Sequence, residues 1–318
     1  MKSDKIPVIC VVGPTASGKT DLAVNIAKKM SGEIISADSM QIYKEFNIST
    51  AKPTLKQMCG IKHHCIDIVS VKENFSVAKY VSFAEKIIKD IFSIGKIPIL
   101  CGGTGLYIDS LIKNIPFEKG KTNISIRNRI INYINVNNAG YFFDKLKKID
   151  PSSAKKINIH DHKRICRAIE FYYTNGYPIY RQVENSLKSK SCYNVCKIGL
   201  NFKDRNILYD RINKRVDFMV KNGILDEIAS IKDIGDTAKF SIGYKELLPF
   251  INAESSLKEC TERLKMETRR YAKRQITWFK RDLSTKWFNA DEYENVSNLF
   301  CNVQKCILDS GILGHVSK

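Results

Sequence analysis

The chain has 318 residues, of which 43% are hydrophobic and 27% are charged, and its formal net charge is +19. This composition is that of a globular protein with one large core or two smaller ones, and it argues against extensive disorder. The longest apolar runs, residues 8–12 and 97–101, are too short to cross a membrane. The positive charge favours acidic polymers as partners, although a generally basic surface would give the same total.

The ten cysteines have neither the spacing of a disulfide framework nor that of a zinc site. Cys10 and Cys101 lie within apolar runs, where cysteine usually acts as a small buried hydrophobe. The first residues pass almost at once into an apolar run, so we expect no signal or transit peptide. These features predict a cytoplasmic protein with reduced thiols and no membrane association.

Residues 8–12 predict a buried strand, and residues 21–29 have the apolar spacing of a helix. The loop between them consists of Gly13, Pro14, Thr15, Ala16, Ser17, Gly18, Lys19 and Thr20. A glycine-rich loop that ends in Gly-Lys-Thr between a strand and a helix is the context of a phosphate-binding P-loop. Backbone N–H groups bind the phosphate, Lys19 supplies an ammonium, and Thr20 is the predicted Mg²⁺ ligand. The usual ligand is a nucleoside triphosphate, but the loop alone does not identify the phosphorylated molecule.

Residues 33–38 predict a second strand that ends on Asp38, and Gln41 follows in its loop. The loops that leave neighbouring parallel strands share one crevice, so we expect Asp38 and Gln41 beside the P-loop. An acid at this position could hold Mg²⁺ or act as a general base, and the segment alone does not separate these roles.

Residues 47–68 are predicted to be irregular, because proline and glycine interrupt them. Residues 76–93 predict an amphipathic helix, and residues 97–101 a further strand. A second glycine loop at residues 102–107 follows this strand and brings Thr104 toward the same crevice. A simple tight turn would explain its glycines equally well.

Residues 114–196 lose the β-branched runs and become basic and helical in pattern. We predict that they form an insertion domain, which divides a catalytic core made of residues 1–113 and 197–318. Arg164 and Arg167 lie three residues apart on one helical face and suit an anionic partner. A solvated helical face is the alternative.

Residues 197–202 restore strand character, and helices are predicted at residues 205–222 and 224–232. Arg211 and Arg215 are four residues apart, so both face the crevice or both face water. This pattern returns the chain to the predicted sheet.

Residues 256–281 predict a long helix that begins with a capping box of Ser256 and Glu259. Its second half, residues 269–281, mixes cations with aromatic residues and contains no acid, which suits phosphates and stacked bases. One strand and one helix are predicted after Trp287.

Together these segments resemble the tRNA dimethylallyltransferase (tRNA isopentenyltransferase) family, from Val8 to about Phe279. The motifs that carry the resemblance lie at residues 13–20, 38–43, 50–53, 102–107, 150–151, 164, 167–170, 211–212, 215–217, 242–246 and 273–279. Each motif is modest alone, but the ordered set is specific. Asn175-Gly176 departs from the more usual Thr-Gly, and the absence of a C-terminal zinc finger favours the bacterial type.

The resemblance implies an α/β fold: a P-loop NTPase-like parallel sheet flanked by helices, with a mostly helical insertion domain. It implies transfer of a dimethylallyl group from dimethylallyl diphosphate to N6 of the adenosine 3′-adjacent to the anticodon in tRNA. The P-loop and Arg215 would bind the diphosphate, with Mg²⁺ at Thr20. Asp38 would be the general base, and Thr104 would contact the reacting centre.

The implied tRNA-binding residues are Asp38, Ser39, Met40, Gln41, Thr104, Lys163, Arg164, Arg167, Gly243, Tyr244, Lys245, Arg274 and Gln275. The implied partners are the tRNA anticodon stem-loop and dimethylallyl diphosphate, and a monomer is expected. An ATP-dependent kinase of a nucleotide-like substrate is the second interpretation, but the basic helical insertion fits it poorly. A P-loop RNA-binding protein without catalysis would leave Asp38 and Thr104 unexplained.

Overall fold

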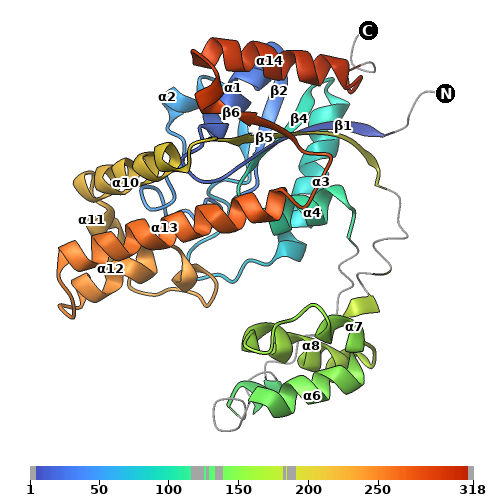
Figure 1. Cartoon of the computed structure of the whole chain (residues 1–318), viewed down its shortest axis with the longest axis vertical. Helices are drawn as coiled ribbons and strands as arrows, with labels where there is room; N and C mark the ends of the chain where they lie inside the picture. Colours follow the sequence, from blue (N-terminus) through green and yellow to red (C-terminus); the bar gives the residue numbers. More distant parts are fainter. Residues whose placement is uncertain are drawn as a thin grey trace. The chain divides into compact units, whose positions relative to one another are not determined.

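The computed structural model of the chain divides into two compact units, which are described separately (Figure 1). The first unit comprises residues 1–112 and 192–318, and the second comprises residues 113–191. The structure describes residues 5–115, 125–126, 129–132, 139–181, 184 and 191–313. The remaining residues of the predicted insertion domain therefore lie outside the part of the chain that the structure describes.

The first unit is built on a six-stranded sheet in the order β3-β2-β4-β1-β5-β6, and every pairing in it is parallel. The strands are β1 (Ile6–Val12), β2 (Gly32–Ser36), β3 (His63–His64), β4 (Ile97–Gly102), β5 (Tyr193–Asn201) and β6 (Lys286–Asn289). The predicted α/β class with a parallel sheet is thus confirmed. Strand β1 lies centrally, with Ile9 opposite Ile99 on one side and Cys196 on the other.

Strand β2 ends at Ser36, so Asp38 lies in the loop two residues beyond the strand rather than at its end. Strands β5 and β3 also differ from the prediction. Strand β5 begins at Tyr193 rather than at Lys197, because its first four residues pair with the start of β1. Strand β3 has only two residues and lies in a segment predicted to be irregular, which also contains the short helix α2 (Leu55–Met58). Two residues are too few to give a periodic signal, so this edge strand could not be recognised.

Helices cover both faces of the sheet (Figure 1). One face packs on apolar side chains of α1 (Lys19–Lys29) and α14 (Val296–Asp309). The opposite face is covered by α3 (Val77–Ser93) and α4 (Gly105–Ile112). Apolar residues on α3 recur at helical spacing and are buried, which is the pattern that predicted this helix.

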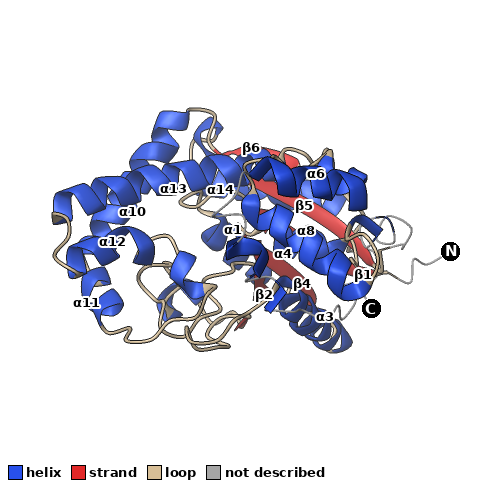
Figure 2. Ribbon diagram, turned by 90° about the horizontal axis from the view of Figure 1, so that it is seen from below, coloured by secondary structure: helices blue, strands red, loops and turns tan. Residues whose placement is uncertain are grey.

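Helices α10 (Arg205–Lys221), α11 (Ile224–Ala229), α12 (Tyr244–Ile251) and α13 (Leu257–Phe279) gather beyond one end of the strands (Figure 2). Two 3-10 turns, at Ala238–Phe240 and Ala290–Glu292, complete the described elements of this unit. The capping box predicted for α13 is present, with Ser256 and Glu259 bonded reciprocally. None of the described helices is long and apolar enough to span a membrane.

The described part of the second unit contains α6 (Ala139–Ile149), α7 (Pro151–Ala154) and α8 (His162–Asn175). Asp150 and Asp161 cap the last two helices, each accepting a hydrogen bond from a backbone N–H three residues later. A small core of its own includes Phe142, Leu146 and Ile165. The basic side chains of α8 therefore lie on a helix whose N-terminus is capped.

Candidate active site

The P-loop has the geometry that a phosphate cradle requires. Strand β1 ends at Val12, and α1 begins at Lys19 directly after Gly18, which adopts φ +89°. A Cβ on Gly13 would lie 2.3 Å from the carbonyl oxygen of Leu200, so the loop passes too close to β5 for any side chain. The Lys19 ammonium lies over the loop and donates to the Pro14 carbonyl at 3.2 Å. The loop therefore has the conformation of a P-loop, and this conformation requires glycine at positions 13 and 18.

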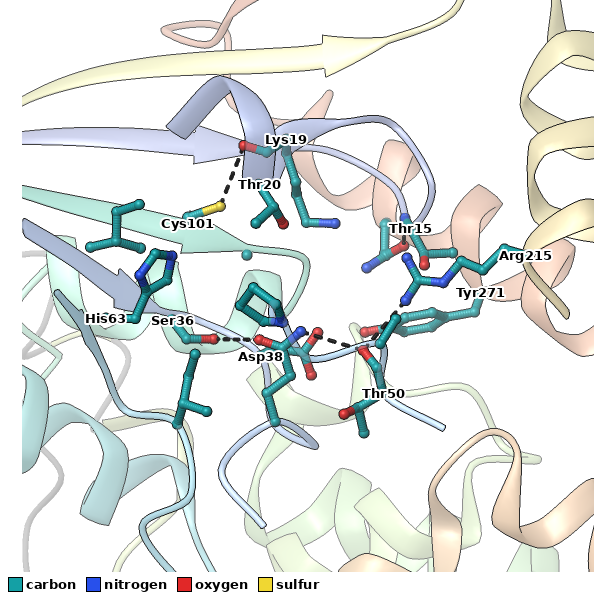
Figure 3. Close-up of a pocket in the computed structure, with 17 residues that line it drawn as sticks. Thr15, Lys19, Thr20, Ser36, Asp38, Thr50, His63, Cys101, Arg215 and Tyr271 are labelled. Atoms are coloured by element: carbon teal, nitrogen blue, oxygen red, sulfur yellow. Dashed lines mark hydrogen bonds between the residues drawn. The ribbon is translucent and has the colours of Figure 1, made fainter. Parts of the chain in front are cut away.

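Two cavities meet beside this loop. The inner cavity, of about 70 Å³, lies under the P-loop, and residues such as Lys19 and Thr20 line it. The outer cavity, of about 290 Å³, has a more apolar wall that includes Met219 and Leu264. The residues that line both cavities are Thr15, Asp38, Thr50, Arg215 and Tyr271. Figure 3 shows these five residues among those that line the inner cavity, and we refer to their position as the junction of the two cavities.

Asp38 lies at this junction, half-buried, with its Oδ1 accepting a hydrogen bond from the Met40 N–H at 2.9 Å. Burial lowers the pKa of Lys19, and repulsion from Arg215 lowers it further, while Asp38 opposes the shift. Burial also lowers the pKa of Arg215, again opposed by Asp38. A carboxylate therefore faces a cluster of partly desolvated cations, which is an arrangement suited to an anionic ligand.

Thr104 connects the loop after β4 to the loop after β2 by hydrogen bonds. Its Oγ1 accepts from the Ser39 N–H at 3.0 Å and lies 3.3 Å from the Ser39 hydroxyl, and its own N–H donates to Ala37. Burial and the negative charge of Asp38 raise the pKa of Tyr271, and the Thr104 side chain interacts with the phenol. Thr104 does not line either cavity, but it contacts Tyr271, which lies at the junction together with Asp38.

Arg211 and Arg215 both lie on the P-loop side of α10, but Arg215 lines the two cavities whereas Arg211 is exposed and lines neither. Arg211 Nε donates to the Ala16 carbonyl at 2.8 Å. Arg215 donates from its guanidinium to the Thr50 carbonyl at 3.3 Å. Gln41 Nε2 donates to the same Thr50 carbonyl at 3.3 Å, so Gln41 lies beside the P-loop as predicted.

Gln275, which was predicted to contact tRNA, is buried and lines the inner cavity. Its side chain is 4% exposed, with Oε1 accepting from the Thr15 N–H at 2.9 Å and Nε2 donating to the Gly103 carbonyl at 3.1 Å. A Cβ on Gly103 would lie 2.0 Å from Gln275 Nε2, and one on Gly105 would lie 2.2 Å from Trp278. The second glycine loop therefore makes room for α13, and a tight turn alone does not explain it.

The other predicted tRNA-binding residues of the first unit fall into two groups. Ser39, Met40, Gly243 and Arg274 line the outer cavity, and Lys245 is exposed on α12. Tyr244 is 8% exposed and packs against Phe46, with ring centroids 6.2 Å apart. Tyr244 is thus a core residue, because its ring fills the space between α12 and the loop after β2.

Lys163, Arg164 and Arg167 all lie on α8 in the second unit. Arg164 pairs with Asp161 at 3.2 Å, and Arg167 pairs with the fully buried Glu170 at 3.2 Å. Each arginine therefore has an acidic partner within one turn of its own helix, which sequence spacing alone did not show.

Tyr271 and Trp278 belong to residues 269–281, which the sequence marked as suited to phosphates and bases, whereas His63 was not recognised from the sequence as part of the site. Tyr271 and Trp278 lie four residues before and three residues after Gln275 on α13, a spacing that would have placed them on one face with it. His63 lines the inner cavity, and its Nδ1 lies 2.9 Å from the Ile61 carbonyl. Nothing in the local sequence of the two-residue strand β3 indicates that this ring reaches the cavity.

No cluster of three or more histidine, cysteine, aspartate or glutamate side chains suited to a metal occurs among the described residues. The ten cysteines all lie in the part of the chain that is described, and each is a free thiol. The oxygen ligands available in the inner cavity include the Thr20 hydroxyl and the Asp38 carboxylate. Such hard oxygen ligands suit Mg²⁺ when the phosphates of a ligand and water complete its shell.

Comparisons with known proteins show the family of the chain. The family model of the IPP transferases matches residues 41–282. The tRNA dimethylallyltransferase of Thermoanaerobacter sp. (strain X514) is 48% identical over 305 residues, covering 94% of this chain and 97% of that protein.

Solved structures are similar as well. The tRNA isopentenylpyrophosphate transferase of Bacillus halodurans aligns with a TM-score of 0.71 and 35% identity, over 98% of this chain and all of that one. A eukaryotic dimethylallyltransferase acting on tRNA aligns with a TM-score of 0.78 and 28% identity, over 96% of this chain and 80% of that one. The chain belongs to the IPP transferase family.

Proposed function

We propose that this chain transfers a dimethylallyl group from dimethylallyl diphosphate to N6 of the adenosine 3′-adjacent to the anticodon in tRNA. The observation that carries the proposal is the junction of two cavities at Asp38, one under a P-loop and one with a wide apolar wall. A phosphorylated donor and a planar acceptor can then approach each other from two sides. The family membership supports this reaction.

The donor occupies the inner cavity, with its diphosphate against the P-loop. Backbone N–H groups at the N-terminus of α1 point at anions, and Lys19 and Arg215 add positive charge beside them. The carbon–oxygen bond to the diphosphate breaks during transfer, so negative charge grows on the leaving group. Lys19 and Arg215 stabilise that charge where it develops.

Mg²⁺ is the metal that this site fits. The Thr20 hydroxyl would hold it together with oxygens of the diphosphate, because Mg²⁺ prefers oxygen ligands and retains water. When bound, the metal would supply additional neutralisation of the leaving diphosphate.

The acceptor base occupies the outer cavity. A base stacked in the anticodon loop cannot reach Asp38, so the adenosine is extruded from the stack. Its exocyclic amine is a weak nucleophile, because the lone pair is delocalised into the ring. As N6 forms the new bond to carbon, Asp38 accepts the proton that N6 loses. Thr104 and Tyr271 lie close enough to orient the reacting groups.

The tRNA is held by basic side chains of both units. Arg274 and Ser39 line the outer cavity, and Lys163 and Arg164 are exposed on α8. The net charge of +19 supports binding of the anticodon stem-loop through its phosphates. The protein acts as a cytoplasmic monomer. Gln275 and Tyr244, which are buried, shape the site without touching RNA.

A transfer assay with labelled dimethylallyl diphosphate and unmodified tRNA tests the function. Label should enter the tRNA, and a tRNA with guanosine at the target position should remain unlabelled. Incubation with ATP in place of the isoprenoid should give no transfer. Phosphorylation of a nucleotide with no response to the isoprenoid would establish the kinase interpretation instead.

A further inference from the structure

Opposite charges hold the loop of residues 43–52, which we call the Thr50 loop, from two sides. Lys52 closes the loop from within, and its side chain is 7% exposed. Its ammonium donates to the backbone carbonyls of Tyr43 and Lys44 and forms an ion pair with Asp67. The carbonyl oxygens at the start of the loop are thus gathered by a single buried cation.

Glu227, on α11, holds the other side of the Thr50 loop. Its Oε2 accepts from the N–H groups of Asn47 at 2.8 Å and Ile48 at 2.6 Å. Its Oε1 accepts from the N–H of Ser49 at 3.0 Å. A carboxylate that receives three consecutive backbone donors forms charge-assisted hydrogen bonds, which are roughly twice as strong as neutral ones. Glu227 therefore fixes the path of the chain immediately before Thr50.

The backbone carbonyl of Thr50 connects this loop to the candidate active site. It accepts from Arg215 and from Gln41, in each case at 3.3 Å, and the Thr50 hydroxyl donates to Phe46 at 2.7 Å. Arg215 has no acidic partner at salt-bridge distance within the described residues, so this carbonyl is the polar group that orients its guanidinium. A shift of the loop would break this hydrogen bond, and the guanidinium would lose the partner that fixes its direction.

We propose that Glu227 is a positioning residue for the diphosphate, acting through the Thr50 carbonyl on Arg215. This inference rests on the proposed function, because it takes the ligand of the P-loop to be a diphosphate. Glu227 itself does not line the inner or the outer cavity. Its influence on the ligand is therefore indirect, and the effect of removing it should disappear when Arg215 is absent.

The test measures pyrophosphate binding to the full chain by titration calorimetry with Mg²⁺ present. Glu227→Gln keeps the length of the side chain but places an N–H donor against backbone donors, and it should weaken pyrophosphate binding about tenfold. Asp226→Asn removes the same charge from the neighbouring exposed position of α11 and should leave binding unchanged. Glu227→Asp, which keeps the carboxylate, should give an intermediate loss.

A double-mutant cycle with Arg215→Ala separates positioning from general damage. In that background Glu227→Gln should cause no further loss of pyrophosphate affinity. Equal losses in both backgrounds would overturn the inference, as would normal affinity in Glu227→Gln. If Glu227→Gln does not fold, Glu227→Asp in both backgrounds provides the same comparison. A wild-type chain that fails to bind pyrophosphate would reject the proposed donor site itself.

Discussion

The side-chain oxygen of Gln275 accepts a hydrogen bond from the backbone N–H of Thr15 at 2.9 Å, although 260 residues separate them in sequence. The amide nitrogen of the same side chain donates to the Gly103 carbonyl at 3.1 Å. One buried amide therefore links the P-loop to the loop after β4. Because both glycine loops border the site, the spacing between them depends on α13.

We expect Gln275→Ala to destabilise the protein, because it leaves the Thr15 N–H and the Gly103 carbonyl without their partner. An unsatisfied buried polar group costs about 1–3 kcal/mol of unfolding free energy. Urea denaturation measures this loss. Gln304→Ala on α14, which removes an amide remote from both glycine loops, is the matched control and should stay close to wild type. Unchanged stability of Gln275→Ala would show that water replaces the amide.

Lys19→Ala should weaken pyrophosphate binding and leave tRNA affinity nearly unchanged, because its ammonium lies in the inner cavity. Hydrogen bonds to charged groups are worth about 1.5–3 kcal/mol, so we expect roughly a tenfold to hundredfold loss. Titration calorimetry with pyrophosphate and filter binding with tRNA measure the two affinities. Lys28→Ala, at an exposed position of the same helix, is the control. An equal loss of pyrophosphate and tRNA affinity would mean that the P-loop binds RNA directly.

The exposed cations of α8 are expected to bind tRNA phosphates. The double variant Lys163→Ala with Arg164→Ala should weaken tRNA binding at moderate salt and leave pyrophosphate binding unchanged. For every phosphate that the variant no longer binds, the slope of log K against log salt should fall by about 1. Binding measured across a salt series gives this slope. Lys28→Ala with Lys29→Ala removes the same charge from α1, and an equal change in its slope would mean that total charge alone controls binding.

Much of this site could be predicted from local sequence, and the rest depends on distant contacts. The P-loop, Asp38 and Arg215 could be located because each follows from a motif or a strand end. The buried positions of Tyr244 and Gln275 could not, because each is buried by segments far away in the chain. The start of β5 and the existence of β3 depend likewise on pairing rather than on local pattern.

The contacts of the Thr50 loop also could not be predicted from local sequence. The charges of Lys52 and Glu227 are 175 residues apart, and each alone is typical of an exposed position. Only the fold brings α11 against this loop, where the carboxylate meets three backbone donors. Sequence motifs mark the groups that touch a ligand more readily than the groups that hold them in place.

An ion pair between a buried lysine and a partly buried aspartate gives a pH-dependent contribution to stability. Lys197 on β5 is 2% exposed and lies 2.6 Å from Asp282. Burial raises the pKa of Asp282, but hydrogen bonds from Lys197 and Ser284 outweigh it and lower the pKa from 3.8 to about 2. The stabilisation is therefore present above pH 3.8 and is lost as the pH falls through about 2.

Asp282→Asn should reduce the unfolding free energy at pH 7 by about 2 kcal/mol, which is the contribution that a pKa shift of this size implies. Denaturation between pH 2 and pH 7 should show a smaller acid-dependent loss than in wild type. Asp90→Asn, at an exposed position of α3, serves as the control. An unchanged pH dependence in Asp282→Asn would show that Asp109, 3.6 Å from the ammonium, neutralises Lys197 alone.

The prediction that bears most directly on the reaction concerns Asp38. Asp38→Asn keeps the shape of the side chain and the hydrogen bond from Met40, but an amide cannot accept the proton that N6 loses. General-base catalysis typically contributes about a hundredfold to ten-thousandfold, so turnover should fall within that range. Labelled dimethylallyl transfer to unmodified tRNA measures the rate under saturating donor and tRNA.

Binding measurements decide what a slow Asp38→Asn variant means. The side chain lies at the junction of the two cavities, so its replacement should change pyrophosphate and tRNA affinities far less than turnover. Asp90→Asn should retain the wild-type rate. A large loss of pyrophosphate affinity with a normal maximal rate would assign Asp38 to holding Mg²⁺, because the carboxylate would then act on the leaving group and not on N6. Normal turnover with normal affinities would remove Asp38 from both roles.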